Sequence, residues 1–190
     1  MIKPRIVSYA QNREDILLSG FFDMSEKGFY VDVGANDPIE DSGTRFFYER
    51  GWTGINFEPV KRHHDALCKD RPNDINMNVG VSDKPGTLRF REYKNTGLST
   101  FANDMKHDYS DEDLKYTGDH TDYDVEVRTL TSVFAELKVK KINFMKVDVE
   151  GLEYEVLAGN DWKVYRPMVI CIEANHMIKD WKSLLLKEGY

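Results

Sequence analysis

A chain of 190 residues is the size of one domain and is long enough to bury a substantial core. Its net charge of −7 argues against sequence-independent binding to nucleic acid, and no apolar stretch reaches the roughly 20 residues that span a bilayer. The two cysteines form neither a metal-ligand spacing nor a disulfide framework. Because the N-terminal residues lack the apolar core of a secretory signal, we predict a single cytoplasmic domain over residues 1–190.

The first half of the chain alternates between helical and strand patterns. Apolar residues at helical spacing predict helices, and short apolar runs that end in glycine or an acid predict buried strands. The cluster Lys61–His64 lies between a strand and an apolar helical position, so we interpret it as the solvated first turn of a helix. In chain order, we predict a helix over about 8–20, a strand over 29–33, a helix over 44–50, a strand over 54–58, a helix over about 60–69 and a strand over 75–79.

The second half continues this alternation after one polar interruption. Residues 103–124 are acidic and nearly free of aliphatic side chains, so we predict a long mobile insertion there. A helix should begin at Thr131 or Ser132, either of which can cap it. Alternating strands and helices predict an α/β fold with a doubly wound, mostly parallel sheet and helices on both faces. The remaining predicted elements are strands over 87–93, 125–130, 142–149 and 168–173, a short helix ending at Gly159 and a helix over 180–187.

Acidic residues follow four of the predicted strands. Asp32 lies at the end of the first strand, just before Gly34, and Glu58 ends the second. Right-handed crossovers place the carboxyl ends of parallel strands at one edge of a sheet, where α/β proteins bind ligands. The spacing from Asp32 to Glu58 is close to that at which a second-strand acid accepts hydrogen bonds from a ribose, so an adenosine-containing ligand is plausible. The other acids of this kind are Asp148 with Glu150, and Glu173.

Several ordered motifs together resemble the FkbM family of S-adenosylmethionine-dependent methyltransferases. The resemblance covers nearly the whole chain and implies a Rossmann-like class I methyltransferase fold. It also implies methyl transfer to a hydroxyl group, usually on a sugar or another natural-product intermediate. The motifs that carry it are Tyr9–Asp15, Phe29–Pro38, Thr44, Gly51–Gly54, Phe57–Pro59, Asn78–Asp83, Leu98–Thr100 and Lys146–Gly151.

The resemblance also implies which residues bind the cofactor, S-adenosylmethionine. Glu58 would hold the ribose, and Pro59 follows it in the same motif. Two of these assignments keep an alternative interpretation: Asp32 as an acid that caps its own loop, and Ser82 with Asp83 as a plain turn. Asp32, Gly34, Ala35 and Asn36 would surround the methionine part, and Val81, Ser82 and Asp83 would border the adenine.

The catalytic residues are predicted at the ends of the later strands. Strand alternation places Lys146, Asp148 and Glu150 on one face. Our hypothesis is that Asp148 removes the hydroxyl proton or positions the acceptor, supported by Lys146 and Glu150; the alternative is a structural ion pair between Lys146 and Asp148. His176, beside Glu173, is a second candidate base, although a solvated loop histidine is the simpler interpretation. With Asp148 and Glu150 these two residues also resemble a Mg²⁺ or Mn²⁺ ligand set, a metal site that we do not expect.

Two other functions stay open at this point. The strand and acid spacing permits a nicotinamide-dependent oxidoreductase, but the G-x-G-x-x-G pattern is absent. The third alternative is a non-catalytic cofactor-binding module.

Class I methyltransferases normally end in a strand hairpin that this chain lacks, and an exposed sheet edge would favour a homodimer. We expect a small-molecule or glycan acceptor, shaped by Leu98–Thr100 and the insertion, and neither a nucleic acid nor a membrane as partner.

Overall fold

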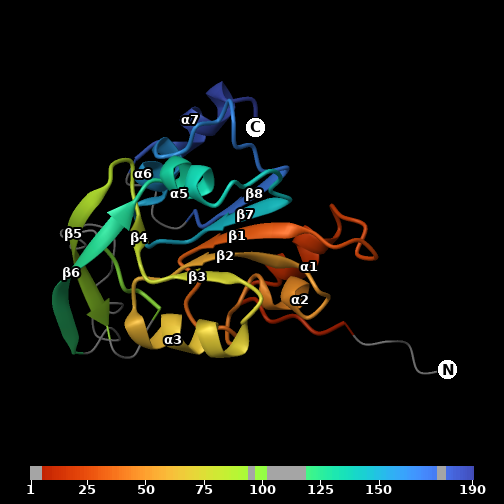
Figure 1. The fold of residues 1–190 in the computed structure, drawn as a ribbon, viewed down its shortest axis with the longest axis horizontal. Coiled ribbons are helices and arrows are strands. Elements are labelled where there is room, and N and C mark those ends of the chain that lie inside the picture. The colour runs from red at the N-terminus through yellow and green to blue at the C-terminus, as the bar shows by residue number, and fades with distance from the viewer. Residues whose placement is uncertain (1–5, 94–96, 102–118, 175–178) are drawn as a thin grey trace.

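The large sheet of the protein is parallel. A computed structural model describes residues 6–93, 97–101, 119–174 and 179–190. In this part, neighbouring strands of the sheet pair in parallel in the order β3-β2-β1-β7-β8, as Figure 1 shows. This confirms the predicted doubly wound, mostly parallel α/β fold, with β3 and β8 at the two edges of the sheet. The five strands are β1 (Phe29–Val33), β2 (Thr53–Phe57), β3 (Ile75–Met77), β7 (Phe144–Val147) and β8 (Val169–Ile172).

Helices cover both faces of this sheet because its strands are apolar on both sides. Val31 and Val33 point into one core, which α5, α6 and α7 cover. Tyr30, which directly precedes Val31 in the sequence, points to the other face and into a second core with Phe47 and Trp52. Figure 1 shows α5, α6 and α7 above the sheet and α1, α2 and α3 below it. The helices are α1 (Glu14–Ser19), α2 (Arg45–Tyr48), α3 (Lys61–Asp70), α5 (Leu130–Glu136), α6 (Glu153–Ala158) and α7 (Trp181–Lys187).

The N-terminal helix is shorter than predicted. It begins at Glu14 rather than near residue 8, because Arg13 adopts a left-handed conformation with φ 64°. The preceding residues instead fold around the buried carboxylate of Asp15, which accepts hydrogen bonds from Ser8 Oγ at 2.7 Å and Tyr9 N at 2.8 Å. A carboxylate that collects local donors in this way competes with the helix for the same backbone groups.

The third predicted strand ends two residues early, at Met77, and a separate short strand follows it. This strand, β4 (Gly80–Val81), pairs with β6 (His120–Arg128), which also pairs with β5 (Gly86–Tyr93) in a second, three-stranded sheet of order β4-β6-β5. Asn78 lies at the crossing, where its Nδ2 donates to the backbone oxygens of Glu58 and Pro59 at 2.9 Å each. The second sheet therefore stands beside the carboxyl end of β2, as Figure 1 shows.

The strand β6 extends into the segment predicted as a mobile insertion. It begins at His120, whereas the prediction began the strand at residue 125. The polar residues are stabilised across the antiparallel pair with β5 (Gly86–Tyr93), where Arg91 forms a bidentate ion pair with Asp122, both bonds 2.8 Å long. Cross-strand pairs of opposite charge favour strand pairing in a sequence that has few apolar residues. Residues 103–118 of the predicted insertion lie outside the described residues.

Two further boundaries differ from the prediction. The cap of α5 is Thr129, whose side chain accepts a hydrogen bond from Ser132 N, rather than Thr131 or Ser132. The strand β7 ends at Val147, two residues before the predicted end. Across the described ranges, we find no helix with the length and apolar character needed to cross a membrane.

Candidate functional site

An open cavity lies between the carboxyl ends of the large sheet and the inner face of the small one. Its empty volume is about 620 Å³ counted out to the solvent at its mouth. The large sheet and the loops that follow its strands contribute Val33, Gly34, Asn36, Phe57, Glu58, Pro59, Asp148, Val149 and Glu150; the facing wall includes Val81, Phe90, Ser99 and Phe101.

The turn after β1 is fixed by backbone contacts. Gly34 N and Ala35 N both donate to Phe57 O at 3.1 Å. Gly34 has φ 81°, and a Cβ there would lie 1.8 Å from the backbone oxygen of Asp148. A side chain is excluded both by the backbone conformation and by the crossing chain. The space into which a side chain would project is thus filled by the protein's own backbone, and Gly34 also lines the cavity.

Glu58 is held at the cavity wall by two backbone donors. Its side chain accepts from Asn36 N and from Val60 N, each at 2.7 Å, and the residue is 4% exposed. Burial raises the pKa of Glu58 to about 7, against the opposing effect of those two hydrogen bonds. Each carboxylate oxygen has a second lone pair, so both can accept one further hydrogen bond from a ligand.

A chain of buried charges lies behind the cavity. Asp32, 1% exposed, accepts from Thr44 Oγ1 at 2.7 Å and lies 3.9 Å from Lys146 Nζ. Lys146 Nζ donates to Asp148 Oδ2 at 2.8 Å. Burial acts to lower the pKa of Lys146, but the carboxylates of Asp148 and Asp32 outweigh it and the pKa is raised. Lys146 therefore stays charged and links a buried acid to an acid at the cavity wall.

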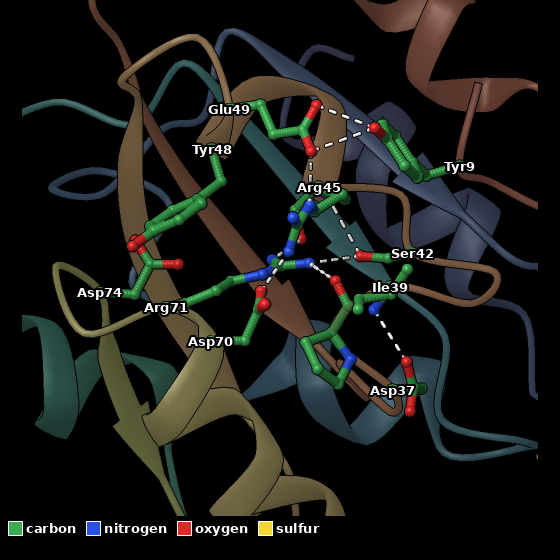
Figure 2. Close-up of polar contacts among 12 residues, drawn as sticks. Tyr9, Asp37, Ile39, Ser42, Arg45, Tyr48, Glu49, Asp70, Arg71 and Asp74 are labelled. Atoms are coloured by element: carbon green, nitrogen blue, oxygen red, sulfur yellow. Dashed lines mark hydrogen bonds and ion pairs between the residues drawn. The ribbon is translucent and has the colours of Figure 1, made fainter. Parts of the chain in front are cut away.

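Arg71 extends this chain through Thr44, and Figure 2 shows its side chain reaching Ser42. Its guanidinium is buried and donates to Pro38 O, Ser42 Oγ and Thr44 Oγ1, each at 2.6 Å. Thr44 accepts from Arg71 and donates to Asp32, so its single hydroxyl orders both groups. The loop that leads from the β1 turn into α2 is thus tied to the end of α3.

We expect Thr44→Val to lower the free energy of unfolding by about 2 kcal/mol, because it leaves buried groups of Asp32 and Arg71 without a partner. Valine fills nearly the same volume as threonine, so the decrease in stability comes from the missing hydroxyl group. Urea unfolding at pH 7 measures the free energy of unfolding of both proteins. Thr44→Ser keeps the hydroxyl and serves as the matched control; a valine variant as stable as the serine variant would contradict the prediction.

The loop after β7 carries two of the predicted acids, Asp148 and Glu150. Asp148 N continues the strand pairing by donating to Val33 O at 3.0 Å, but Glu150 adopts a left-handed conformation with φ 53°. Glu150 therefore reaches the cavity through a turn, not through the strand alternation that was predicted to place it. Its backbone oxygen accepts from Thr100 Oγ1 at 2.7 Å, which joins this turn to the facing wall.

The side chains of Asp148, Glu150 and Glu173 each place one carboxylate oxygen within 4.8 Å of the others. Oxygen ligands of this kind suit hard cations such as Mg²⁺. One of the three, Asp148, already has a cation beside it in Lys146. His176, the fourth predicted member of this group, lies outside the described residues.

The predicted site residues divide into those that line the cavity and those that support it. Asp32 and Lys146 lie behind it in the buried charge chain. Ala35 and Ser82 are 5% exposed and, with Asp83, lie outside the lining. The predicted residues that line the cavity are Gly34, Asn36, Glu58, Pro59, Val81, Asp148 and Glu150.

Several lining residues were not among the predicted site residues, and three of them have side chains that can contact a ligand. His63, in the first turn of α3, faces the cavity from the cluster interpreted as solvated, and burial followed by the charge of Arg62 lowers its pKa. Phe90 and Phe101 contribute aromatic rings 4.6 Å apart to the facing wall. His63 could have been predicted to line the cavity, because it follows shortly after Glu58 at the end of a strand. The sequence pattern around Phe90 predicted a strand but not which neighbour its side chain would meet.

Comparisons with known proteins agree with this architecture. The family model described as the Methyltransferase FkbM domain matches residues 32–190. A curated relative, the methyltransferase sdnD of Sordaria araneosa, is 30% identical over 169 residues, which cover 75% of this chain and 65% of the relative. The chain thus spans less than two thirds of that relative's length. No solved structure matches the chain significantly. The predicted resemblance is confirmed, and this chain belongs to the FkbM methyltransferase family.

Proposed function

We propose that this protein transfers a methyl group from S-adenosylmethionine to a hydroxyl group of a small-molecule or glycan acceptor. One observation carries the proposal: a single cavity is lined by the β1 turn, by Glu58 and by the acids that follow β7. The first two match the cofactor motifs of the family, and the third supplies groups that can bind a hydroxyl. Membership of a methyltransferase family favours this function over the nicotinamide alternative.

The residues present fit the cofactor. Glu58 offers two oxygens to the ribose hydroxyls, and the Gly34–Asn36 turn lies next to it for the methionine part. Val81 would border the adenine from the other side of the cavity. The bound cofactor supplies an activated methyl group on a positively charged sulfur. Asp32 supports this site from behind, through Thr44 and Lys146.

Asp148 is the group proposed to receive or orient the acceptor's hydroxyl proton. Its carboxylate is partly exposed at the cavity wall, and the Lys146 ammonium fixes the direction of one of its oxygens. A base must lie within hydrogen-bond reach of the proton that it removes. The described lining residues include the carboxylates of Glu58, Asp148 and Glu150 but no lysine or arginine. This favours uncharged, hydroxylated acceptors over phosphorylated ones.

Calorimetry separates the alternatives. We expect S-adenosylhomocysteine to bind and NAD not to bind, and we expect methyl transfer to at least one member of a panel of sugars and hydroxylated natural products. NAD binding without S-adenosylhomocysteine binding would overturn the proposal. Cofactor binding with no transfer to any acceptor would favour a non-catalytic binding module.

The affinity for S-adenosylhomocysteine should depend on pH through Glu58. The ionised carboxylate accepts hydrogen bonds at both oxygens, whereas the protonated acid presents a donor at one of them. With a pKa of about 7 in the free protein, the ionised fraction falls roughly tenfold between pH 8 and pH 6. We therefore expect the dissociation constant, measured by calorimetry, to be about tenfold higher at pH 6 than at pH 8, which means weaker binding at pH 6.

Two variants test this assignment. Glu58→Gln should bind weakly and show no such change between pH 6 and pH 8. His63→Gln should retain the pH dependence, because the imidazole lines the same cavity but is not the proposed ribose ligand. A pH dependence that disappears in His63→Gln and persists in Glu58→Gln would assign the titration to the histidine instead.

A further inference from the structure

A second hollow lies at the opposite ends of the parallel strands. It is formed by the loop that leads into β7 and the loop that leads into β8, with an empty volume of about 500 Å³ counted out to solvent. Both loops precede their strands, whereas the methyl-transfer cavity lies where the strands end. The hollow is lined by Val139, Lys140, Lys141, Ile142, Lys163, Val164, Tyr165, Arg166 and Met168.

The charge of this hollow is opposite to that of the first. Four of its lining residues are cations and none is an acid, in a protein whose net charge is −7. Lys140, Lys141 and Lys163 are exposed and form no ion pair with any residue in the described ranges. The acid adjacent in sequence, Asp161, accepts a hydrogen bond from Lys163 N at 3.0 Å. Like charges held close together repel unless an anion lies between them.

The fourth cation is held in place by the protein. Arg166 Nη1 donates to Trp162 O at 3.4 Å, and its guanidinium lies 4.8 Å from the centre of the Tyr190 ring. Behind the cations, the wall of the hollow is apolar, with Ile142 only 3% exposed. Low-dielectric walls concentrate the field of surrounding charges, which strengthens their attraction for an anion.

We propose that this hollow binds a multivalent oxyanion, with a phosphate or diphosphate group as the preferred class. Lysine ammonium groups attract phosphate as point charges, and an arginine guanidinium matches its geometry with two parallel donors. Two cations come from each loop, so an anion seated between them bridges the two loops. The site is separate from the methyl-transfer cavity, and its ligand is not the methyl acceptor.

An NMR titration of the full chain with inorganic pyrophosphate tests the proposal. We expect saturable shifts of the backbone amides in residues 138–142, 163–166 and 168, with a dissociation constant on the order of 1 mM or tighter at low ionic strength. The response should weaken as salt is added, because screening reduces the attraction. No saturable response, or shifts spread equally over lysines elsewhere on the surface, would overturn it.

A pair of charge-matched variants makes the test specific. The double variant Lys140→Gln and Lys141→Gln should weaken pyrophosphate binding by on the order of tenfold. The double variant Lys69→Gln and Lys84→Gln removes the same charge from exposed positions outside the hollow and should leave binding unchanged. If both double variants lose the same affinity for pyrophosphate, the effect comes from net charge alone and the proposed site is wrong. Both double variants should bind S-adenosylhomocysteine with the affinity of the unmodified protein.

The phosphate group could belong to a soluble molecule or to a lipid headgroup. Flotation with vesicles of phosphatidylcholine, with and without phosphatidic acid, distinguishes the two sources. Binding that requires phosphatidic acid and is lost in the Lys140 and Lys141 variant assigns the site to a headgroup. Pyrophosphate binding without vesicle binding assigns it to a soluble phosphate, and failure of both arms rejects the site.

Discussion

Replacing Asp148 with asparagine will reduce methyl transfer by about 10²- to 10⁴-fold, the usual contribution of a general base. The amide cannot take up the hydroxyl proton, although it has nearly the same shape as the carboxylate. Asp148 follows β7, whereas Glu58, which is proposed to hold the ribose, follows β2 on the other side of β1. The affinity for S-adenosylhomocysteine, measured by calorimetry, should therefore change by no more than about threefold. The rate of methyl transfer is measured with an acceptor that is methylated in the panel of sugars and hydroxylated natural products.

The control for this variant is Glu150→Gln. Glu150 lines the same cavity, but it reaches it through a left-handed turn and has a supporting role in the proposal. Its amide variant should retain more activity than Asp148→Asn. If Asp148→Asn keeps full turnover while cofactor binding is unchanged, Asp148 is not the base. In that case its contact with Lys146 is a structural ion pair, the alternative that the sequence left open.

Lys146→Met will lower the free energy of unfolding by about 3 to 5 kcal/mol near pH 7, because it leaves a buried acid without its nearest cation. Asp32 is 1% exposed, and the Lys146 ammonium lies 3.9 Å from its Oδ1. Methionine fills similar space, so the loss comes from the charge. Urea unfolding of the two proteins measures the difference.

The direction of the pH effect provides a check on this prediction. Burial raises the pKa of Asp32, and removal of Lys146 takes away the largest opposing charge. In the variant the folded state then binds a proton more readily than the unfolded chain, so its stability rises as the pH falls below neutral. Asp32→Asn combined with Lys146→Met should recover part of the loss at pH 7. A double variant no more stable than Lys146→Met would show that Asp32 is not the cause.

The local patterns of this sequence predict the fold because they act over few residues. Val31 and Val33 alternate with Tyr30 and Asp32, and this alternation identifies a strand that is buried on both sides. The glycine and acid that follow such strands indicate their carboxyl ends. Glu58 and Asp148 could therefore be assigned to one edge of the sheet, and both do line one cavity.

Long-range contacts decide what the local patterns miss. His120 to Asp124 look like loop residues until Arg89 and Arg91 of the opposite strand are placed beside them. The loop before α2 receives its shape from Arg71, which lies far along the chain. Asp32 carries a methyltransferase motif, yet its carboxylate contacts Thr44 and Lys146 behind the cavity. Such partners depend on how the helices and strands meet, which no single segment encodes.

The two walls of the cavity belong to separate hydrogen-bonded sheets. β5 pairs with β6 along its length, and Phe90 and Phe101 lie on or beside this hairpin, whereas Gly34, Asn36 and Glu58 follow strands of the large sheet. Substitutions and insertions in the hairpin can therefore accumulate without breaking the strand pairing of the opposite wall. Related proteins can diverge in what they recognise on one side while they preserve the other.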